Sequence, residues 1–531
     1  MSTTNSAPPG QQTVKEADSH RSIIKSTYII GLGTLTSRVL GFFRDVILAK
    51  LLGTGSMADA FFVAFKIPNL FRDLVGEGAV NAAIVPLMHE YKEKKEALWE
   101  FFSVVLILAM IVLSVITILG ILLAPVIVRL MAPGFIIDRE KLELTIFLTK
   151  LLFPYLLLIG LTAYSMGILY TFRSFKIPAF SPCLLNIAMI VSAYFARGMK
   201  EPVVGLAIGV LVGGFLQLFV QIKPVFDLGI RFKKPSTLRH PMAMRMAKLL
   251  LPRMLGGGVY QLTVFIDTFC ASLSSIVGPG GISAIYYANR IIQFPMGIFS
   301  VAMASAVLPT LSTFAHKNDL PSMKRMIIFS LENIFFIMCP TTVVLLLLSS
   351  PIIRLLFQRG EFDFYSTQIT SWALAYLSIG LFSFGGIKIL VTAFHSLQDT
   401  KTPVKVAALC LVINTALNFI LMYPLKVGGI ALASALAGTI DFLILFYILD
   451  KKLGGLNSGL LVFLGKTLFA SALTGIVEFF AWNHLVFSQD LVKLIVVGVF
   501  GFVFYGLLCY ALGVAQARKV WEWFRRGMAF E

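Results

Sequence analysis

The chain has 531 residues, of which 57% are hydrophobic and only 14% are charged, with a formal net charge of +18. Soluble proteins contain about 25% charged residues, and several uncharged windows here exceed the roughly 18 apolar residues needed to cross a bilayer core. The composition therefore excludes a soluble protein and predicts an all-α polytopic membrane protein. Most of the positive charge lies in short loops between apolar segments, so we expect no nucleic-acid partner.

The apolar segments predict about fourteen transmembrane helices. The first 25 residues are polar and lack the apolar core of a signal peptide, so we expect them to form a disordered cytoplasmic tail. The predicted spans are, in chain order, residues 27–51, 57–88, 99–128, 144–171, 178–196, 202–222, 246–273, 282–314, 327–357, 365–394, 403–424, 427–449, 460–482 and 491–516.

The charges of the loops predict the orientation in the membrane. With the N-terminus in the cytoplasm, the loops on that side include residues 89–100, 223–248 and 316–325. Together with the other loops on the same side, they hold about three times as many Lys and Arg residues as the opposite loops, which is the positive-inside bias. Because the number of spans is even, the C-terminus is also expected in the cytoplasm.

The sequence contains a weak internal repeat. The stretch beginning at Phe62 aligns with the stretch beginning at Tyr286, which places Pro86 opposite Pro309 at an offset of about 223 residues. LYTFRSFKIP and AFHSLQDTKTP match at nearly the same offset. Two parallel six-helix repeats are a transporter architecture, with the substrate site between them. The expected segments are a tail at 1–25, an N-lobe at 26–226, a linker at 227–245, a C-lobe at 246–450, two extra helices within 451–517 and a cytoplasmic tail at 518–531.

Charged residues gather in the first two predicted spans, although each charge at the bilayer centre costs at least about 2.5–3.5 kcal/mol. They are Arg38, Arg44, Asp45, Asp59, Lys66, Arg72, Asp73 and Glu77. Asp59, Lys66 and Asp73 recur every seven residues and share a helix face. Two interpretations follow: the charges pair with one another and stabilise the bundle, or the arginines line a cavity.

The eighth span adds Arg290, which has no acidic residue within one helical turn. If the two repeats face each other, arginines from both of them converge on one cavity. A guanidinium group suits bidentate recognition of phosphate or diphosphate, so this pattern predicts an anionic substrate.

These residues carry a resemblance to a known family. The run from Ser37 to Tyr91 closely resembles the opening of the MurJ (MviN) lipid II flippases, which belong to the multidrug/oligosaccharidyl-lipid/polysaccharide (MOP) exporter superfamily, and YYANRIIQFP, LFQRGEFD and FHSLQDTKTP resemble later motifs of that family. The resemblance implies fourteen helices in two lobes plus a C-terminal pair, and outward flipping of lipid II, the lipid-linked peptidoglycan precursor, across the bacterial inner membrane. The roles it implies are substrate binding by Arg38, Arg44, Arg72 and Arg290, and gating or pairing by Asp45, Asp59 and Glu77.

A sodium site is expected in the C-lobe. Asp267 is a lone acid in the seventh span, Asn414 and Asn418 share a helix face, and Ser434 follows on the next span. Oxygen ligands from several helices suit Na⁺, and some members of the family are similar in placing a sodium site between these helices. Asn418 stands where such a site can carry a second acid. The alternative is that Asp267 is hydrogen-bonded to these amides for structure alone.

Other functions compete with the flippase. A related exporter of the same superfamily could carry another polyprenyl-diphosphate-linked oligosaccharide, and a drug or cation antiporter would need an acid-dominated cavity instead. A membrane enzyme acting on polyprenyl phosphates would need clustered acids for Mg²⁺, or a base with a nucleophile. The six histidines are scattered and no such motif occurs, so we expect neither an enzyme nor a cofactor other than Na⁺, and we expect a monomer whose partners are lipid II and membrane lipids.

Overall fold

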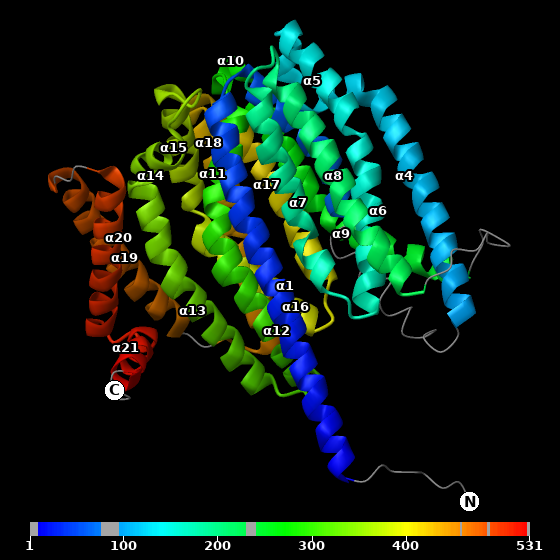
Figure 1. Ribbon diagram of the computed structural model, residues 1–531. Helices are drawn as coiled ribbons and strands as arrows, with labels where there is room; N and C mark the ends of the chain where they lie inside the picture. Colours follow the sequence, from blue (N-terminus) through cyan, green and yellow to red (C-terminus); the bar gives the residue numbers. More distant parts are fainter. Residues whose placement is uncertain (1–8, 76–94, 230–240, 457–458, 486–488, 528–531) are drawn as a thin grey trace, which may run out of the picture. The chain divides into compact units, whose positions relative to one another are not determined.

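The computed structural model describes residues 9–75, 95–229, 241–456, 459–485 and 489–527, and within these ranges the chain is helical and has no strand (Figure 1). The helices up to residue 272 are α1 (Pro9–Leu52), α2 (Ser56–Val75), α4 (Lys95–Met131), η1 (Pro133–Ile136), α5 (Arg139–Leu152), α6 (Pro154–Thr171), α7 (Lys176–Ala196), α8 (Pro202–Asp227) and α9 (Pro241–Ser272). They are followed by α10 (Ser274–Val277), α11 (Gly281–Pro295), the π-helix η2 (Met296–Ser300), α12 (Val301–His316), α13 (Leu320–Leu347), α14 (Ser349–Phe357), α15 (Phe364–Ser378), α16 (Leu381–Ser396), α17 (Lys401–Leu425), α18 (Val427–Leu453), α19 (Gly459–His484), α20 (Asp490–Ala511) and α21 (Ala515–Gly527).

The chain forms two compact units. Unit 1 comprises residues 1–48, 64–127 and 145–257, and unit 2 comprises residues 49–63, 128–144 and 258–531. Unit 1 thus contains most of the predicted N-lobe. Unit 2 contains the predicted C-lobe from residue 258 onward, the two extra helices, and two short segments that belong to the first repeat in sequence.

Most of the predicted spans correspond to single long helices. Within the described ranges, ten helices are long and apolar enough to cross a membrane, or eleven if α15 and α16, bent by 47°, form one span. The predicted spans 27–51, 57–88 and 246–273 are not among these helices. Span 27–51 lies within α1, whereas spans 57–88 and 246–273 extend beyond the ends of α2 and α9. The first two of these spans carry the charge cluster, and residues 76–88 lie outside the described ranges.

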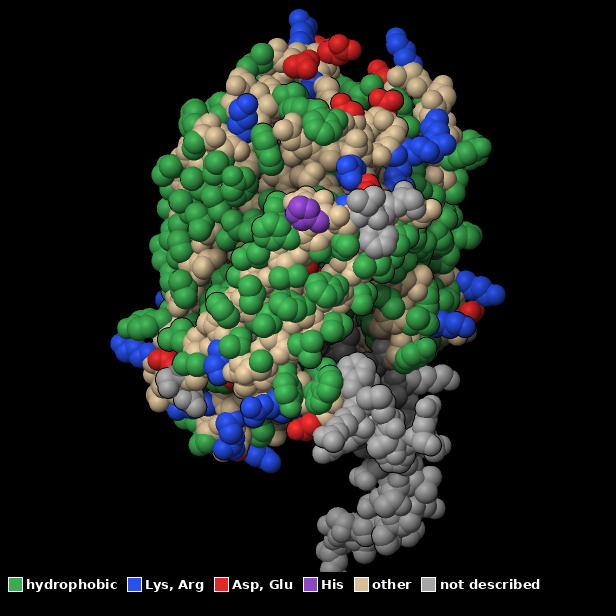
Figure 2. Space-filling view, turned by 90° about the vertical axis from the view of Figure 1, so that its left-hand side faces the viewer, with side chains coloured by type: hydrophobic (Ala, Val, Ile, Leu, Met, Phe, Trp, Pro, Cys, Tyr) green, Lys and Arg blue, Asp and Glu red, His purple; other side chains and the backbone are tan. Residues whose placement is uncertain are grey.

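The surface has the character expected in a bilayer. Leu461 and Phe502, in the last two apolar helices, are 75% and 73% exposed. On the face shown in Figure 2, hydrophobic side chains form a broad band, and Lys and Arg side chains gather beyond its margins. Exposed apolar side chains over such an area are stable only against lipid, so this band marks the membrane-facing surface. The five cysteines, by contrast, are all buried and free.

The order and spacing of the helices confirm the repeat. The α7 and α17 helices begin at Lys176 and Lys401, and α8 and α18 begin at Pro202 and Val427, so each pair is 225 residues apart. In unit 1, α7 packs on α8, and in unit 2, α17 packs on α18. The same helical hairpin therefore occurs once in each unit.

The prediction of a disordered tail at residues 1–25 is wrong from Pro9 onward, because α1 begins there and continues to Leu52 without a break. The consecutive residues Lys15, Glu16 and Ala17 and the pair Gln11 and Gln12 favour helix, and proline is well tolerated in the first turn. The polarity of this stretch therefore did not predict its backbone conformation. At about 1.5 Å per residue, α1 is roughly twice as long as the bilayer core is thick.

Within unit 2, the end of α1 is joined closely to the second repeat. The amide of Glu361 donates to the carbonyl oxygen of Lys50 at 3.0 Å. Gly53 and Gly280 have φ angles of +57° and +78°, and a Cβ atom at these positions would meet the carbonyl oxygens of Glu361 and Thr54. Glycine is required at both sites because the backbone is left-handed and the chains approach too closely for a side chain.

The motif FHSLQDTKTP connects α16 to α17 through Asp399. The Asp399 carboxylate accepts hydrogen bonds from the amide and hydroxyl of Thr402, at 3.0 and 2.8 Å, and caps the first turn of α17. Lys452, at the end of α18, donates to the same carboxylate at 2.7 Å, and this bond is the main reason why the pKa of Asp399 falls to about 2. The motif therefore ties the start of α17 to the end of α18.

Candidate functional site

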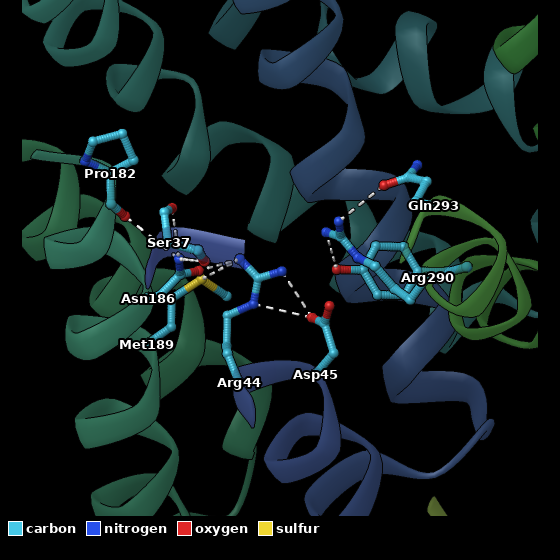
Figure 3. A network of polar contacts seen from close by, with 9 residues as sticks. Ser37, Arg44, Asp45, Pro182, Asn186, Met189, Arg290 and Gln293 are labelled. Atoms are coloured by element: carbon cyan, nitrogen blue, oxygen red, sulfur yellow. Dashed lines mark hydrogen bonds and ion pairs between the residues drawn. The ribbon is translucent and has the colours of Figure 1, made fainter. Parts of the chain in front are cut away.

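Arg44 and Asp45 form a buried polar cluster in α1 (Figure 3). Nε and Nη2 of Arg44 donate to Oδ1 of Asp45 at 3.0 and 2.8 Å, and Nη1 donates to Oδ1 of Asn186 on α7 at 3.0 Å. Asn186 in turn donates to the carbonyl oxygen of Ser37. Arg44 and Asp45 are only 5% and 0% exposed. The charge of Arg44 is thus balanced by its neighbour, and α1 is held against α7.

Asp59 forms a second buried cluster, in unit 2. Its Oδ1 accepts hydrogen bonds from the amide and hydroxyl of Ser283 at 2.9 and 2.7 Å, and its Oδ2 lies 2.9 Å from Nζ of Lys141. Lys141 also lies 4.1 Å from the centroid of the Phe135 ring. Ser283 belongs to the first turn of α11, where backbone amides attract anions. Asp59 therefore joins α2, α5 and α11 through one ion pair and two hydrogen bonds.

Lys141 is a residue that the sequence analysis missed. Asp59 was expected to share a helix face with Lys66, but its ion-pair partner Lys141 comes from α5, 82 positions further along the chain. Lys141 is only 7% exposed, although it lies just before a predicted span in a stretch with charged neighbours. Its neighbours gave no sign of this burial, since a charge next to other charges before a span usually faces water.

Arg290 is half-buried on α11 and packs on aromatic rings (Figure 3). Its Nη2 donates to the hydroxyl of Tyr286 at 2.9 Å, its Nη1 donates to Oε1 of Gln293 at 3.4 Å, and its Cζ lies 5.0 Å from the centroid of the Tyr286 ring. Phe62 stacks on Tyr286 with ring centroids 4.0 Å apart. These contacts hold the guanidinium against the Tyr286 ring on the same helix.

The remaining predicted site residues are described to different extents. Arg38 is exposed on α1 in unit 1, less than two turns before Arg44. Arg72 lies in α2, but its side chain is outside the described part of the chain, as is all of Glu77. The convergence of the four arginines on one cavity therefore remains a prediction.

The four residues of the predicted sodium site do come together in unit 2. Asn418 donates to Oδ1 of Asp267 at 2.8 Å and to Oδ1 of Asn414 at 3.0 Å, and Ser434 donates to Oδ2 of Asp267 at 2.9 Å. Asn414 and Asn418 are 1% and 0% exposed. Within the described residues, Oδ1 of Asn418 is buried and accepts no hydrogen bond. Carboxylate, amide and hydroxyl oxygens in one place fit a hard cation.

A buried acid in the C-terminal pair was also missed. Glu478, on α19, is 2% exposed, and its carboxylate lies directly against Gly501 of α20. Because it is the single acid in predicted span 460–482, Glu478 could have been singled out by the same rule that drew attention to Asp267.

Comparison with known proteins shows what this chain is similar to. The family described as lipid II flippase MurJ matches residues 48–497. A probable lipid II flippase MurJ of Buchnera aphidicola (subspecies Schizaphis graminum) is 35% identical over 434 residues, covering 81% of this chain and 84% of that protein. The lipid II flippase MurJ of Burkholderia cenocepacia is 35% identical over 429 residues, covering 79% and 82%.

Solved structures agree with the sequence comparisons. A lipid II flippase MurJ in an inward closed conformation matches with a TM-score of 0.76 and 28% identity, covering 91% of this chain and 99% of that one. An inward-facing multidrug resistance transporter of the MATE family, in the MOP superfamily, matches with a TM-score of 0.67 and 18% identity, covering 78% and 94%, which shows a shared fold. With the family matched over most of its length, this chain belongs to the MurJ family of lipid II flippases.

Proposed function

We propose that this protein moves lipid II from the cytoplasmic to the periplasmic leaflet by alternating access, and that it is a carrier without catalytic activity. The observation that carries the proposal is the match of residues 48–497 to the flippase family, in a chain that places Arg290 half-buried on α11. Lipid II has a diphosphate that needs cations, a bulky head that needs a hydrated cavity and a tail that stays in lipid. Rocking of two repeats moves such a head without exposing it to hydrocarbon.

The alternatives explain these residues less well. An exporter of another polyprenyl-diphosphate-linked oligosaccharide would use the same arginines, but the family match extends over residues 48–497 and favours lipid II. A cation antiporter would place acids rather than Arg44 and Arg290 at its substrate. The decisive experiment is growth of bacteria depleted of their own lipid II flippase. We expect this chain to restore growth, whereas a chain for another oligosaccharide would be expressed without rescue.

We further propose that the protein works as a monomer in the bacterial inner membrane, with both termini in the cytoplasm and no nucleic-acid partner. The close contact of Lys50 and Thr54 with the second repeat then lies on the periplasmic side. In this proposal it forms a closed periplasmic gate.

This orientation predicts the outcome of cysteine labelling with a membrane-impermeant maleimide. A cysteine at Lys233 should react only from the cytoplasm, and one at Ser275 only from the periplasm. Ser275 is chosen over nearby Gly280 because Ser275 is exposed, whereas Gly280 is buried with a positive φ angle. Labelling of both cysteines from the same side would contradict the span count and the repeat.

The cluster around Asp267 is proposed to hold Na⁺ as a coupling or structural ion. The ligands would be oxygens of Asp267, Asn414, Asn418 and Ser434, and the ion would supply charge neutralisation to the Asp267 carboxylate. Asn418 would turn its unsatisfied Oδ1 toward the ion. A single acid among the ligands predicts weaker binding than a site with two.

Asp267→Ala is expected to abolish the effect of Na⁺ on thermal stability and to reduce lipid II transport. The measurements are unfolding midpoints of the purified protein in NaCl and in KCl, and complementation by a normally expressed variant. Ser330→Ala, at a buried hydroxyl on α13, is the control and should keep any difference between the two salts. If Asp267→Ala transports normally and wild type responds equally to both salts, the ion site should be abandoned.

A further inference from the structure

A cavity of about 430 Å³ lies along the first three turns of α13, in unit 2. Its lining residues are Pro321, Lys324, Arg325, Ile328, Phe329, Glu332 and Gly455. The α13 residues recur at intervals of three or four and so share one helix face. Two cations therefore stand at the start of the helix, and an apolar floor follows them toward the middle of the span.

Lys324 and Arg325 both have N–H groups that can donate hydrogen bonds to a ligand. Nζ of Lys324 donates to the carbonyl oxygen of Gly454 at 3.1 Å, which uses one of the three hydrogens of an ammonium group. Arg325 is exposed, and its Nη2 donates to the Ser322 hydroxyl at 2.9 Å. Both residues lie near the helix N-terminus, whose dipole also favours an anion.

The acid in the cavity stands apart from these cations. Glu332 is eight residues after Lys324, or about 12 Å along the helix axis. Its Oε2 accepts a hydrogen bond from Nε2 of Gln516 at 2.8 Å. Glu332 therefore serves to attach α21 to α13 and leaves the cationic end of the cavity positive.

Helix α21 contacts two of the residues that line the cavity, Phe329 and Glu332. Nζ of Lys519 lies 5.2 Å from the centroid of the Phe329 ring, and Figure 1 shows α21, in red, beside α13. At 100° per residue, Val520 and Trp521 fall on one side of α21, and Arg518 and Lys519 fall on the other. Val520 and Trp521 are 43% and 54% exposed. A basic helix with an exposed tryptophan, placed just after a membrane span, is typical of the lipid–water interface.

We propose that this cavity binds the headgroup phosphate of an anionic phospholipid of the cytoplasmic leaflet. Lys324 and Arg325 contact the phosphate, and the acyl chains run along Ile328 and Phe329. Basic pockets between membrane helices on the cytoplasmic side are suited to such headgroups. A soluble anion would need the cations but would gain nothing from the apolar floor or from the exposed Trp521 of α21. The site does not depend on the transported substrate.

The test measures the unfolding midpoint of the purified full-length protein with dioleoyl phosphatidylglycerol or dioleoyl phosphatidylcholine added in detergent. We expect phosphatidylglycerol to raise the midpoint more, and K324Q/R325Q to lose at least half of that excess. K401Q/K405Q is the matched control, because it removes two exposed cations from the first turns of α17. That control should keep the full excess.

A second measurement is photo-crosslinking in cells, on protein that carries no other substitution. A photo-crosslinking amino acid at Phe329 should capture phospholipid, whereas the same group at Phe364, which is 73% exposed in α15, should capture much less phosphatidylglycerol. An equal response of K324Q/R325Q and wild type to phosphatidylglycerol would overturn the proposal. So would full competition by glycerol 3-phosphate, which would indicate a soluble phosphate ligand. Equal stabilisation by both phospholipids would also refute an anionic headgroup site.

Discussion

Asp59→Ala is expected to destabilise the protein by about 3–5 kcal/mol, because the substitution removes the counter-ion of an ammonium group that is only 7% exposed. Asp59→Ala combined with Lys141→Met should recover most of this loss, since no buried charge then remains in the pair. The measurement is thermal or denaturant unfolding of the purified protein. Glu143→Ala is the control on the same helix, where an exposed Arg139–Glu143 pair should be removed without measurable effect.

The double variant Asp59→Ala/Lys141→Met also distinguishes two roles of this ion pair, one in the periplasmic gate and one in the stability of the fold. Asp59 and Lys141 both belong to the first repeat in sequence, whereas Ser283 belongs to the second. If the periplasmic gate opens between the repeats, the ion pair stays intact and only the bonds to Ser283 break, so the Asp59 charge remains compensated. We expect the double variant to be stable but inactive in complementation. Recovery of growth as well as stability would mean that the pair serves the fold alone.

Arg290→Ala is expected to abolish complementation while leaving the unfolding midpoint nearly unchanged. Arg290 is half-buried, and two of its hydrogen bonds go to Tyr286 and Gln293, which are neutral, so breaking these two bonds leaves no buried counter-charge at either residue. Loss of charge-assisted bonds to a diphosphate should weaken lipid II binding about 10- to 100-fold. Arg290→Lys should restore part of this binding, because lysine keeps the charge but lacks the bidentate fork.

Arg44→Ala is expected to behave differently from Arg290→Ala. Arg44→Ala leaves the Asp45 carboxylate buried without its guanidinium partner, so it should lower stability, and Asp45→Asn in the same chain should restore it. The same design applies to Arg72 with neutralisation of Asp73 or Glu77. Stable single variants that no longer bind lipid II would support a phosphate contact. Variants that recover stability and binding together would assign the arginine to the fold.

The sequence by itself determined the class of this protein and much of its order along the chain. Apolar length located ten or eleven of the fourteen predicted spans, because hydrocarbon requires about 20 apolar residues per crossing and a helix satisfies its own backbone. Helical spacing correctly put Asn414 and Asn418 on one face, and the lone acid Asp267 was correctly expected to meet them. These features follow from local periodicity and from the cost of burying charge in lipid.

Only the tertiary structure decided which charged faces meet. Helical periodicity assigned Asp59 to the same face as Lys66, but packing of α2 against α5 and α11 pairs it with Lys141 and Ser283. The contact of Arg44 with Asn186, 142 positions away, likewise comes from the packing of α1 on α7. A single helix defines its own faces, but its partner is chosen by the fit of side chains on other helices. That fit depends on residues far apart in the chain, so it cannot be predicted from the spacing of residues within one helix.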